Sequence, residues 1–380
     1  MWQLNALNCL LVVTGVVLAQ EPVSVSPDSL ERALAANEFS LVAFVAPSEP
    51  KTKSFREEWI SASRDGSDAL IWVDCEALPT LCQKHGVDTY PTFKFFQGRN
   101  AKSSYLGPRR ASGFLNFIAR SKRPTMAQID VGQLKEFKVI DETAFIGYFA
   151  PEDTVAKQTF SDVAARYRDE FSFGIVSDTA VFGDQNVKPP TVVCHKPEDG
   201  DTHSFSSFSE AGDALEKFVI EASRPVIGEL TKLNQQRLLD RGWPMIYVFA
   251  ETEPERAKLR QTLHRFAKGQ YEALTAVTVD PFEFPELQAQ LGLEPGVFPS
   301  GAVHQLSKDR IYPYPKDLPV NSNALSKFGL DVYQGRVEPW TPPGVTTAYT
   351  DLDPIHTATR KVSIRSVPGL NIRIAGHDEL

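Results

Sequence analysis

Short apolar runs alternate with amphipathic stretches along most of this chain, as strands and helices do in α/β proteins. In the first part of the chain the pattern predicts strands at residues 41–45 and 70–74 and helices at residues 50–62 and 111–121. A further helix is predicted to open within residues 26–31, because Pro, Asp and Glu near its start are favoured at helix N-termini.

The same order of elements recurs twice more. The second unit predicts strands at 137–140, 144–149, 171–176 and 191–195 and helices at 154–167 and 207–221. The third predicts strands at 245–249, 274–279 and after 298–299, and helices at 254–267 and 323–334. Strands that alternate with helices at this spacing indicate βαβ units on a mixed sheet. A repeat of about 100 residues, present three times, indicates tandem domains.

Composition narrows the class of protein further. The chain has 380 residues and a formal net charge of −8, with acidic residues scattered along it. That length is sufficient for two or three domains. Nothing strongly basic suggests a nucleic-acid partner, and no acidic run suggests a calcium-storing tail. No Asn-x-Ser/Thr sequence occurs, so N-glycosylation is not expected.

Both ends of the sequence carry targeting signals. The apolar run at residues 7–18 is short for a membrane span and ends before the small residue Ala19, so residues 1–19 are predicted to be a removable signal peptide. The last four residues, His377-Asp378-Glu379-Leu380, match a retrieval signal of the endoplasmic reticulum (ER). We therefore expect a protein of the ER lumen that binds the retrieval receptor and has no membrane insertion after signal removal.

Few cysteines are available for chemistry. Cys9 leaves with the predicted signal peptide, and Cys75, Cys82 and Cys194 remain. Cys75 and Cys82 could close an eight-residue loop in an oxidising compartment, which would stabilise the fold by about 2.5 kcal/mol. Cys194 lies in an apolar run and is expected to be buried. The His and Cys residues never cluster at ligand spacing, so neither a metal nor another cofactor is expected.

Residues 41–53, Leu-Val-Ala-Phe-Val-Ala-Pro-Ser-Glu-Pro-Lys-Thr-Lys, resemble the first thioredoxin domain of the protein disulfide isomerase family. In that family Ala-Pro is followed by Trp-Cys-Gly-His-Cys-Lys. Aligned on Ala46, Pro47 and Lys53, the two redox cysteines fall on Glu49 and Thr52, with Pro50 and Lys51 between them. A carboxylate and a hydroxyl cannot form a mixed disulfide, so the alignment predicts no catalytic residue at this site.

Other positions fit the same resemblance. The family's buried Glu beneath the cysteines is replaced here by Ala43, and the aromatic residue before the first cysteine by Ser48. The segment Tyr90-Pro91-Thr92 resembles the family's cis-proline segment, which makes Pro91 a fold marker and a weak binding candidate. Some family members also have a cysteine pair at the place of Cys75 and Cys82, and it is structural there.

The resemblance covers roughly residues 22–340 and implies three tandem thioredoxin-like domains, each a mixed sheet flanked by helices. An a-type domain lacking Cys-x-x-Cys is expected at residues 20–125 and a b-type domain at 126–223. A b′-type domain is expected at 224–337, followed by a tail at 338–380. The family would continue into a second catalytic domain, whereas the tail here holds a Pro-containing stretch and the retrieval signal. The second active site is therefore expected to be absent.

In the family the b′ domain carries the main apolar site for unfolded polypeptide. Carried over by position, that site would be formed by Leu238, Leu239, Met245, Tyr247 and Phe298. Met and aromatic side chains suit promiscuous binding. Strand residues 245–249 alternate between two faces, however, so most of them must also serve the core.

Three functional hypotheses follow. The preferred one is a redox-inactive chaperone or client adaptor of the ER lumen, which binds unfolded or misfolded secretory polypeptides and presents them to an active oxidoreductase. The second is an active disulfide isomerase that works through Cys75, Cys82 or Cys194. The third is a non-catalytic assembly subunit with one dedicated partner.

Overall fold

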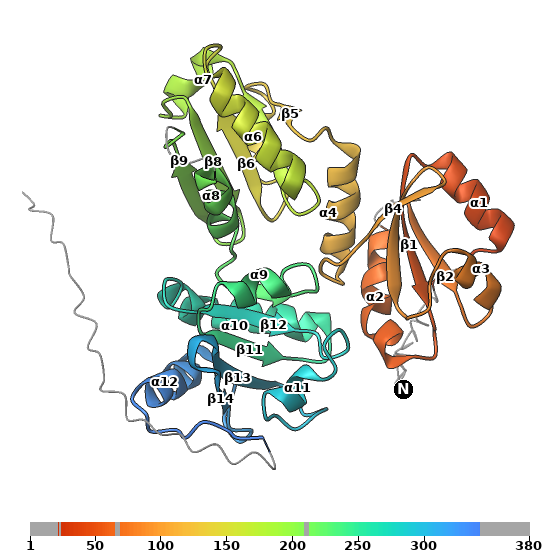
Figure 1. Cartoon of the computed structure of the whole chain (residues 1–380), viewed down its shortest axis with the longest axis vertical. Coiled ribbons are helices and arrows are strands. Elements are labelled where there is room, and N and C mark those ends of the chain that lie inside the picture. The colour runs from red at the N-terminus through yellow and green to blue at the C-terminus, as the bar shows by residue number, and fades with distance from the viewer. Residues whose placement is uncertain (1–21, 23, 65–68, 209–212, 343–380) are drawn as a thin grey trace, which may run out of the picture. The chain divides into compact units, whose positions relative to one another are not determined.

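The computed structural model describes residues 22, 24–64, 69–208 and 213–342, which belong to one compact unit. It contains three mixed sheets, each with helices packed against it (Figure 1). The predicted α/β class with three tandem thioredoxin-like domains is therefore confirmed. The predicted signal peptide, the retrieval signal His377–Leu380 and the tail beyond residue 342 lie outside the described residues, and the predicted domain boundaries stay predictions.

The first sheet has the strand order β2-β1-β3-β4. Its strands are β1 (Phe39–Val45), β2 (Leu70–Asp74), β3 (Thr92–Gln97) and β4 (Asn100–Ser104). Its helices are α1 (Pro27–Ala36), α2 (Pro50–Arg64), α3 (Pro79–Lys84) and α4 (Ala111–Lys122). Strand β1 pairs in parallel with β2 and antiparallel with β3, so it lies at the centre and is buried on both faces. Its carboxyl end leads into α2 and therefore positions the site described below.

The second sheet has the order β5-β7-β6-β8-β9. Its strands are β5 (Ala127–Gln128), β6 (Ala144–Tyr148), β7 (Ser172–Val176), β8 (Thr191–Lys196) and β9 (Asp201–Phe205). Its helices are α5 (Leu134–Phe137), α6 (Thr154–Tyr167), α7 (Thr179–Asp184) and α8 (Ala214–Ala222). The fold repeats the central pattern of the first sheet, because β6 pairs in parallel with β7 and antiparallel with β8.

One predicted strand of this second unit is wrong. Residues 137–140 were expected to be extended, but Phe137 ends α5 and the next residues continue in turns. The Lys138 amide donates to the Leu134 carbonyl and the Val139 amide to the Glu136 carbonyl, so local hydrogen bonds satisfy this backbone. Phe137 is buried while Val139 is exposed, which fits a helical turn, because residues two apart in a strand would point to the same face.

The third sheet has the order β10-β12-β11-β13-β14. Its strands are β10 (Gly228–Leu230), β11 (Met245–Phe249), β12 (Thr275–Val279), β13 (Ser300–Gln305) and β14 (Arg310–Pro313). Its helices are α9 (Gln235–Asp240), α10 (Glu253–Gly269), α11 (Leu287–Gln290) and α12 (Ser322–Tyr333). Helix α10 begins with a capping box, in which the Thr252 hydroxyl accepts from the Glu255 amide and the Glu255 carboxylate accepts from the Thr252 amide.

Within the described ranges, no helix combines the length and the apolar character that a membrane crossing requires.

Candidate functional site

The site predicted to have lost its cysteines lies where β1 ends and α2 begins. The Glu49 amide donates to the Ala46 carbonyl at 3.0 Å, and the Thr52 amide donates to the Glu49 carbonyl at 3.0 Å. Glu49 is half-buried just before the first turn of α2, and Pro50 and Lys51 follow it into the helix. Thr52 is 1% exposed, and its hydroxyl has no hydrogen-bond partner among the described residues. The turn that the alignment predicts to be the degenerate site is therefore hydrogen-bonded into the start of α2, and residues 46–53 carry no thiol.

A second carboxylate lies at the same end of the sheet. Glu76 follows β2, and its Oε1 accepts hydrogen bonds from the Ser48 amide at 3.2 Å and from the Ser48 hydroxyl. Ser48 occupies the position of the family's aromatic residue. A negative charge here opposes the formation of a thiolate nearby, which is the opposite of what thiol chemistry requires.

Beneath this turn, the position of the family's buried acid is taken by an alanine. Ala43 is buried in β1, where it pairs with Trp72 on one side and Phe93 on the other. It belongs to an aromatic core cluster that includes Phe55 and Trp59. The position that would move protons to a buried thiol in the family is thus part of an apolar core here.

The proline that faces the site has the expected backbone geometry. The Tyr90–Pro91 peptide bond is cis, and the next residue, Thr92, pairs with Phe44 near the carboxyl end of β1. This register places Pro91 at the edge where α2 begins. The Phe298–Pro299 bond is also cis, and so is Pro189–Pro190, which the sequence analysis did not single out.

None of the three described cysteines presents a reactive thiol. Cys75 and Cys82 are joined by a disulfide with an S–S distance of 1.98 Å, and both residues are buried. Cys194 is a buried free thiol in β8 that donates a weak hydrogen bond to the Ala222 carbonyl at 3.4 Å. Burial raises the pKa of Cys194 to about 12, so the thiolate is scarce at neutral pH.

Replacing both Cys75 and Cys82 by alanine should lower the free energy of unfolding of the first domain by about 2.5 kcal/mol, because the unfolded chain regains the entropy of a short loop. Urea unfolding with and without a reductant measures this. Reductant should destabilise the wild-type chain and leave the double variant unchanged. Equal stability of the wild-type chain in both buffers would contradict a structural role for the disulfide.

The five residues predicted to bind clients fall into two groups. Met245 and Tyr247 are 0% and 3% exposed, because their side chains lie on the inner face of β11 in the core. A client could reach these two side chains only if this part of the core opened, and their role as client contacts stays a prediction. Leu238, Leu239 and Phe298 are half-buried and pack around the same core cluster. Their role in binding stays a prediction.

A tryptophan beyond α12 packs at the rim of this cluster. The Trp340 amide donates to the Ile311 carbonyl at 2.7 Å, which adds a bridge to the edge strand β14. Its indole lies against Gly292, where a Cβ atom would approach the ring to 2.5 Å; Gly292 also has φ +69°, which favours glycine. The chain after α12 therefore packs against Gly292 and the edge strand β14. Sequence reasoning did not find this contact.

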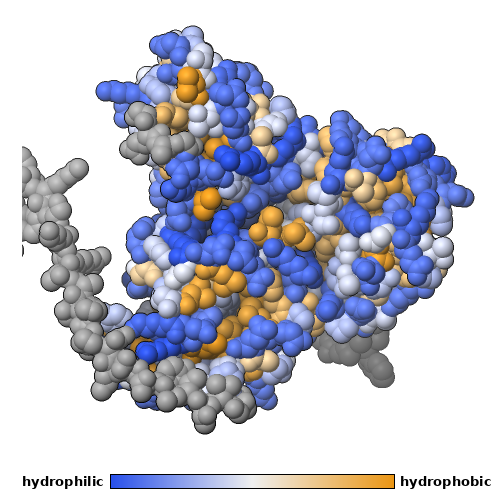
Figure 2. Space-filling model, in the orientation of Figure 1, coloured by the Kyte–Doolittle hydropathy of each residue, from blue (hydrophilic) through white to orange (hydrophobic). Residues whose placement is uncertain are grey.

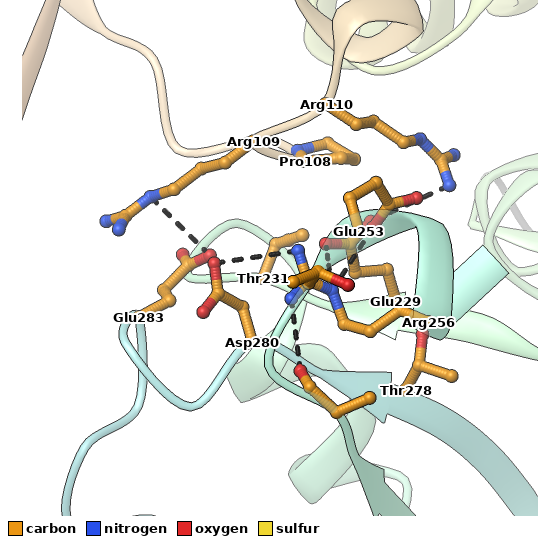
Figure 3. A network of polar contacts seen from close by, with 12 residues as sticks. Pro108, Arg109, Arg110, Glu229, Thr231, Glu253, Arg256, Thr278, Asp280 and Glu283 are labelled. Atoms are coloured by element: carbon orange, nitrogen blue, oxygen red, sulfur yellow. Dashed lines mark hydrogen bonds and ion pairs between the residues drawn. The ribbon is translucent and has the colours of Figure 1, made fainter. Parts of the chain in front are cut away.

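A buried network of charges in the third domain was also missed (Figure 3). At its centre is Arg256 of α10, which is 1% exposed. Its Nε donates to Glu253 at 3.1 Å, and its guanidinium lies 3.7 Å from Asp280 and 3.9 Å from Glu229. Arg260 pairs with the Glu253 carboxylate and donates to the Thr278 hydroxyl at 2.9 Å. Positions 253, 256 and 260 share one helix face, and that spacing was the available sequence signal.

Burial shifts the acids of this network toward their protonated forms. Desolvation raises the pKa of Glu229 and of Asp280, although the nearby arginines oppose the shift. Desolvation also raises the pKa of Glu283 to about 7, with Arg109 acting in the opposite direction. These carboxylates are therefore costly to keep ionised and depend on their arginine partners.

The described surface also exposes scattered large apolar side chains. Figure 2 shows apolar patches on one face, separated by hydrophilic residues. The exposed large apolar residues are Leu106, Val131, Val139, Val155, Leu233, Leu318, Leu330 and Tyr333. No three or more His, Cys, Asp or Glu side chains of the described ranges are grouped so that they could hold a metal ion.

Comparisons with known proteins agree with this geometry. A thioredoxin family model matches residues 21–120, and a model of a thioredoxin-like domain matches residues 149–329. The protein disulfide-isomerase of Humicola insolens is 30% identical over 333 residues, which cover 87% of this chain and 66% of the relative. That of Aspergillus oryzae is 29% identical over 345 residues, which cover 89% and 67%. A crystal structure of human ERp44 has a TM-score of 0.38 at 19% identity and covers 86% of this chain and 92% of that chain.

The fold is that of a thioredoxin-like protein, and the positions of the redox pair on Glu49 and Thr52 stay a prediction of the sequence alignment. The chain belongs to the protein disulfide isomerase family. It spans about two thirds of the length of the curated relatives that it matches. Membership of this family supports a role as an oxidoreductase or a chaperone of the isomerase type.

Proposed function

We propose that this chain is a redox-inactive, isomerase-like protein of the ER lumen that binds unfolded or misfolded polypeptides as a chaperone or client adaptor. The observation that carries the proposal is the turn before α2, where the alignment predicts Glu49 and the buried Thr52 at the positions of the family's thiols. A thiolate is the nucleophile in disulfide exchange, and neither side chain can supply one.

The remaining cysteines favour binding over catalysis. Cys75 and Cys82 are buried and bonded to each other, and the Cys194 thiol is buried with a raised pKa. An exchanging thiol must be accessible and ionised to attack a client disulfide. The structure therefore gives no support to the alternative in which one of these residues replaces the lost pair.

The proposed client surface is the apolar rim of the third domain. Leu238 and Leu239 on α9 and Phe298 before β13 are half-buried beside the core cluster of β11 and β12. Leu233, just before α9, is 39% exposed. Partly exposed leucines and an aromatic ring at one edge are suited to weak, non-specific contacts with extended apolar chains.

The ER location rests on the two terminal signals and on the family. The predicted signal peptide and His377-Asp378-Glu379-Leu380 support entry into the ER and retrieval by its receptor. A disulfide between Cys75 and Cys82 suits an oxidising compartment. An adaptor without redox chemistry of its own would present its clients to an active oxidoreductase, which is the second partner proposed.

Replacing Leu239 by aspartate should weaken the binding of unfolded, apolar peptides about tenfold or more, because a charged group would have to be desolvated in the contact. Fluorescence anisotropy of labelled peptides measures the affinity, and circular dichroism checks the fold. Leu330 is exposed on α12, whose buried residues belong to the other core cluster of this domain, and Leu330→Asp is the control that should bind normally.

Unchanged affinity in Leu239→Asp would argue against the rim as the binding surface. Binding of a single sequence only, with no affinity for unrelated unfolded peptides, would instead favour a dedicated assembly subunit. Met245→Asp is not a useful probe, because a charge in the core would unfold the domain.

A further inference from the structure

The charge network of the third domain is incomplete within that domain. Its buried acids are Glu229, Glu253, Asp280 and Glu283, and its own arginines in the network are Arg256 and Arg260. Four carboxylates therefore face two guanidinium groups. Both oxygens of Glu229, one of Asp280 and one of Glu283 are buried without a hydrogen-bond partner among the described residues. Ionised carboxylates in such surroundings require further positive charge.

The missing charge comes from the first domain. Arg109 and Arg110 lie in the connection between β4 and α4, and Figure 3 shows both pointing toward the carboxylates of the third domain. Arg109 Nε lies 3.7 Å from Glu283 Oε2, with side chains 8% and 2% exposed. Arg110 Nη1 lies 3.6 Å from Glu229 Oε2. Arg110 also pairs with Glu142 of the second domain at 2.7 Å, so the complete network has four arginines and five carboxylates.

The connection that carries the arginines is held in shape by its own domain. Tyr105 donates its hydroxyl hydrogen to the Pro108 carbonyl at 2.6 Å, and Arg109 lies over the Phe93 ring at 5.7 Å. Beside the arginines, the Leu233 amide donates to the Leu106 carbonyl at 3.1 Å, a backbone hydrogen bond between the two domains. A preformed connection loses little conformational freedom when it docks.

We propose that the acidic recess of the third domain is an intramolecular docking site for the arginine pair of the first domain, and that this contact latches the two domains together. The recess is formed by Glu229, Asp280 and Glu283, and its ligand is the segment Pro108–Arg110. Surface ion pairs contribute little to such contacts, but these groups are buried, and removing one side leaves the other side as uncompensated charge. The latch is therefore specific for two adjacent cations. It does not depend on the proposed function.

A cysteine cross-link tests the latch directly. Leu106 and Leu233 are partly exposed, and a backbone hydrogen bond joins them. A variant with both Leu106→Cys and Leu233→Cys should therefore form a disulfide quickly under mild oxidation. The full chain with Cys9→Ser is used, and cross-linking is followed by non-reducing electrophoresis. Adding Arg109→Gln and Arg110→Gln should slow cross-linking about tenfold or more, because the effective concentration of the two thiols falls when the domains separate.

Two further variants complete the test. Arg99→Gln removes an exposed arginine of the same domain and should leave the rate unchanged. Glu229→Gln with Glu283→Gln should also slow cross-linking while relieving the buried charge, so it keeps the test valid if the arginine variant unfolds. Cross-linking that is equally fast in both variants and in the Arg99 control would overturn the latch.

Discussion

Cysteines placed at positions 49 and 52 should convert this chain into a thiol-disulfide oxidoreductase. The Glu49→Cys, Thr52→Cys variant is expected to reactivate a scrambled-disulfide substrate in glutathione buffer about a hundredfold faster than the wild-type chain, whose rate should equal that of buffer alone. The physical reason is that the new thiols would stand at the N-terminus of α2, where the helix dipole lowers the pKa of a thiol.

The geometry around these positions is already that of the family. Pro91 is cis and lies at the same edge of the sheet, and the backbone hydrogen bonds of Ala46, Glu49 and Thr52 form the turn. Two residues would limit the rate. Ala43 supplies no acid beneath the site, and the Glu76 carboxylate beside Ser48 disfavours a thiolate, so adding Glu76→Gln should raise the rate further.

The two single-cysteine variants test the role of each position separately. Glu49→Cys alone should form mixed disulfides that persist, because no second thiol is present to resolve them, and Thr52→Cys alone should stay inert because position 52 is buried. If the double variant has no activity above buffer, the turn before α2 is not a thioredoxin site. Activity in the wild-type chain would mean that Cys75, Cys82 or Cys194 is catalytic after all.

Removing the central guanidinium of the third domain should have the largest effect on stability. Arg256→Met is expected to lower the free energy of unfolding of that domain by about 3–5 kcal/mol at pH 7.5, because Glu253, Asp280 and Glu229 would lose their shared partner. Two backbone carbonyls, Ala250 and Glu251, would lose their donor as well. Urea titration followed by hydrogen exchange of the β12 amides measures the effect in this domain.

The same variant should recover stability as the pH falls. Glu283 illustrates the sign: its pKa of about 7 in the folded chain lies above the ordinary value of 4.5. Its contribution is fully present below pH 4.5 and is lost as the pH rises through about 7. Glu229 and Asp280 shift in the same direction. Without Arg256 their pKa values should rise further, so the deficit of the variant should shrink between pH 7.5 and pH 5.5.

Arg265 provides the matched control, because it is exposed on the same helix and can take the same change to Met. Arg265→Met should leave the stability unchanged within experimental error at both pH values. A loss in Arg256→Met that is no larger than in this control would show that the network does not stabilise the domain. A large loss that is independent of pH would mean that cavity formation, not charge, is responsible.

The sequence predicted the central elements of each sheet well. Strand β11 and strand β2 have the predicted limits, and α6 and α12 differ from their predictions by at most one residue at each end. These segments are long or strongly apolar, so local periodicity decides their conformation. The edge strand β4, whose residues are all exposed, has no alternating pattern and was not predicted. Its conformation is set by pairing with β3.

The site was predictable only in part for a related reason. The missing thiols are visible in the motif at 46–53, since identity alone decides whether a residue can exchange disulfides. Burial is decided by the fold, so the sequence could not separate Leu239, which is half-buried, from Met245, which is in the core. Contacts between distant segments, such as Arg109 with Glu283 and Trp340 with Gly292, leave no periodic signal along the chain.

The buried Cys194 thiol is a built-in probe of local opening in the second domain. Its thiol is held between β8 and the end of α8, so an alkylating reagent can reach it only when that part of the second sheet separates. The ratio of labelling rates in the native and the unfolded chain therefore reports the opening equilibrium of this region, without any introduced probe. A mixed disulfide captured on Cys194 would likewise record an opened second domain rather than an exchange reaction of the native protein.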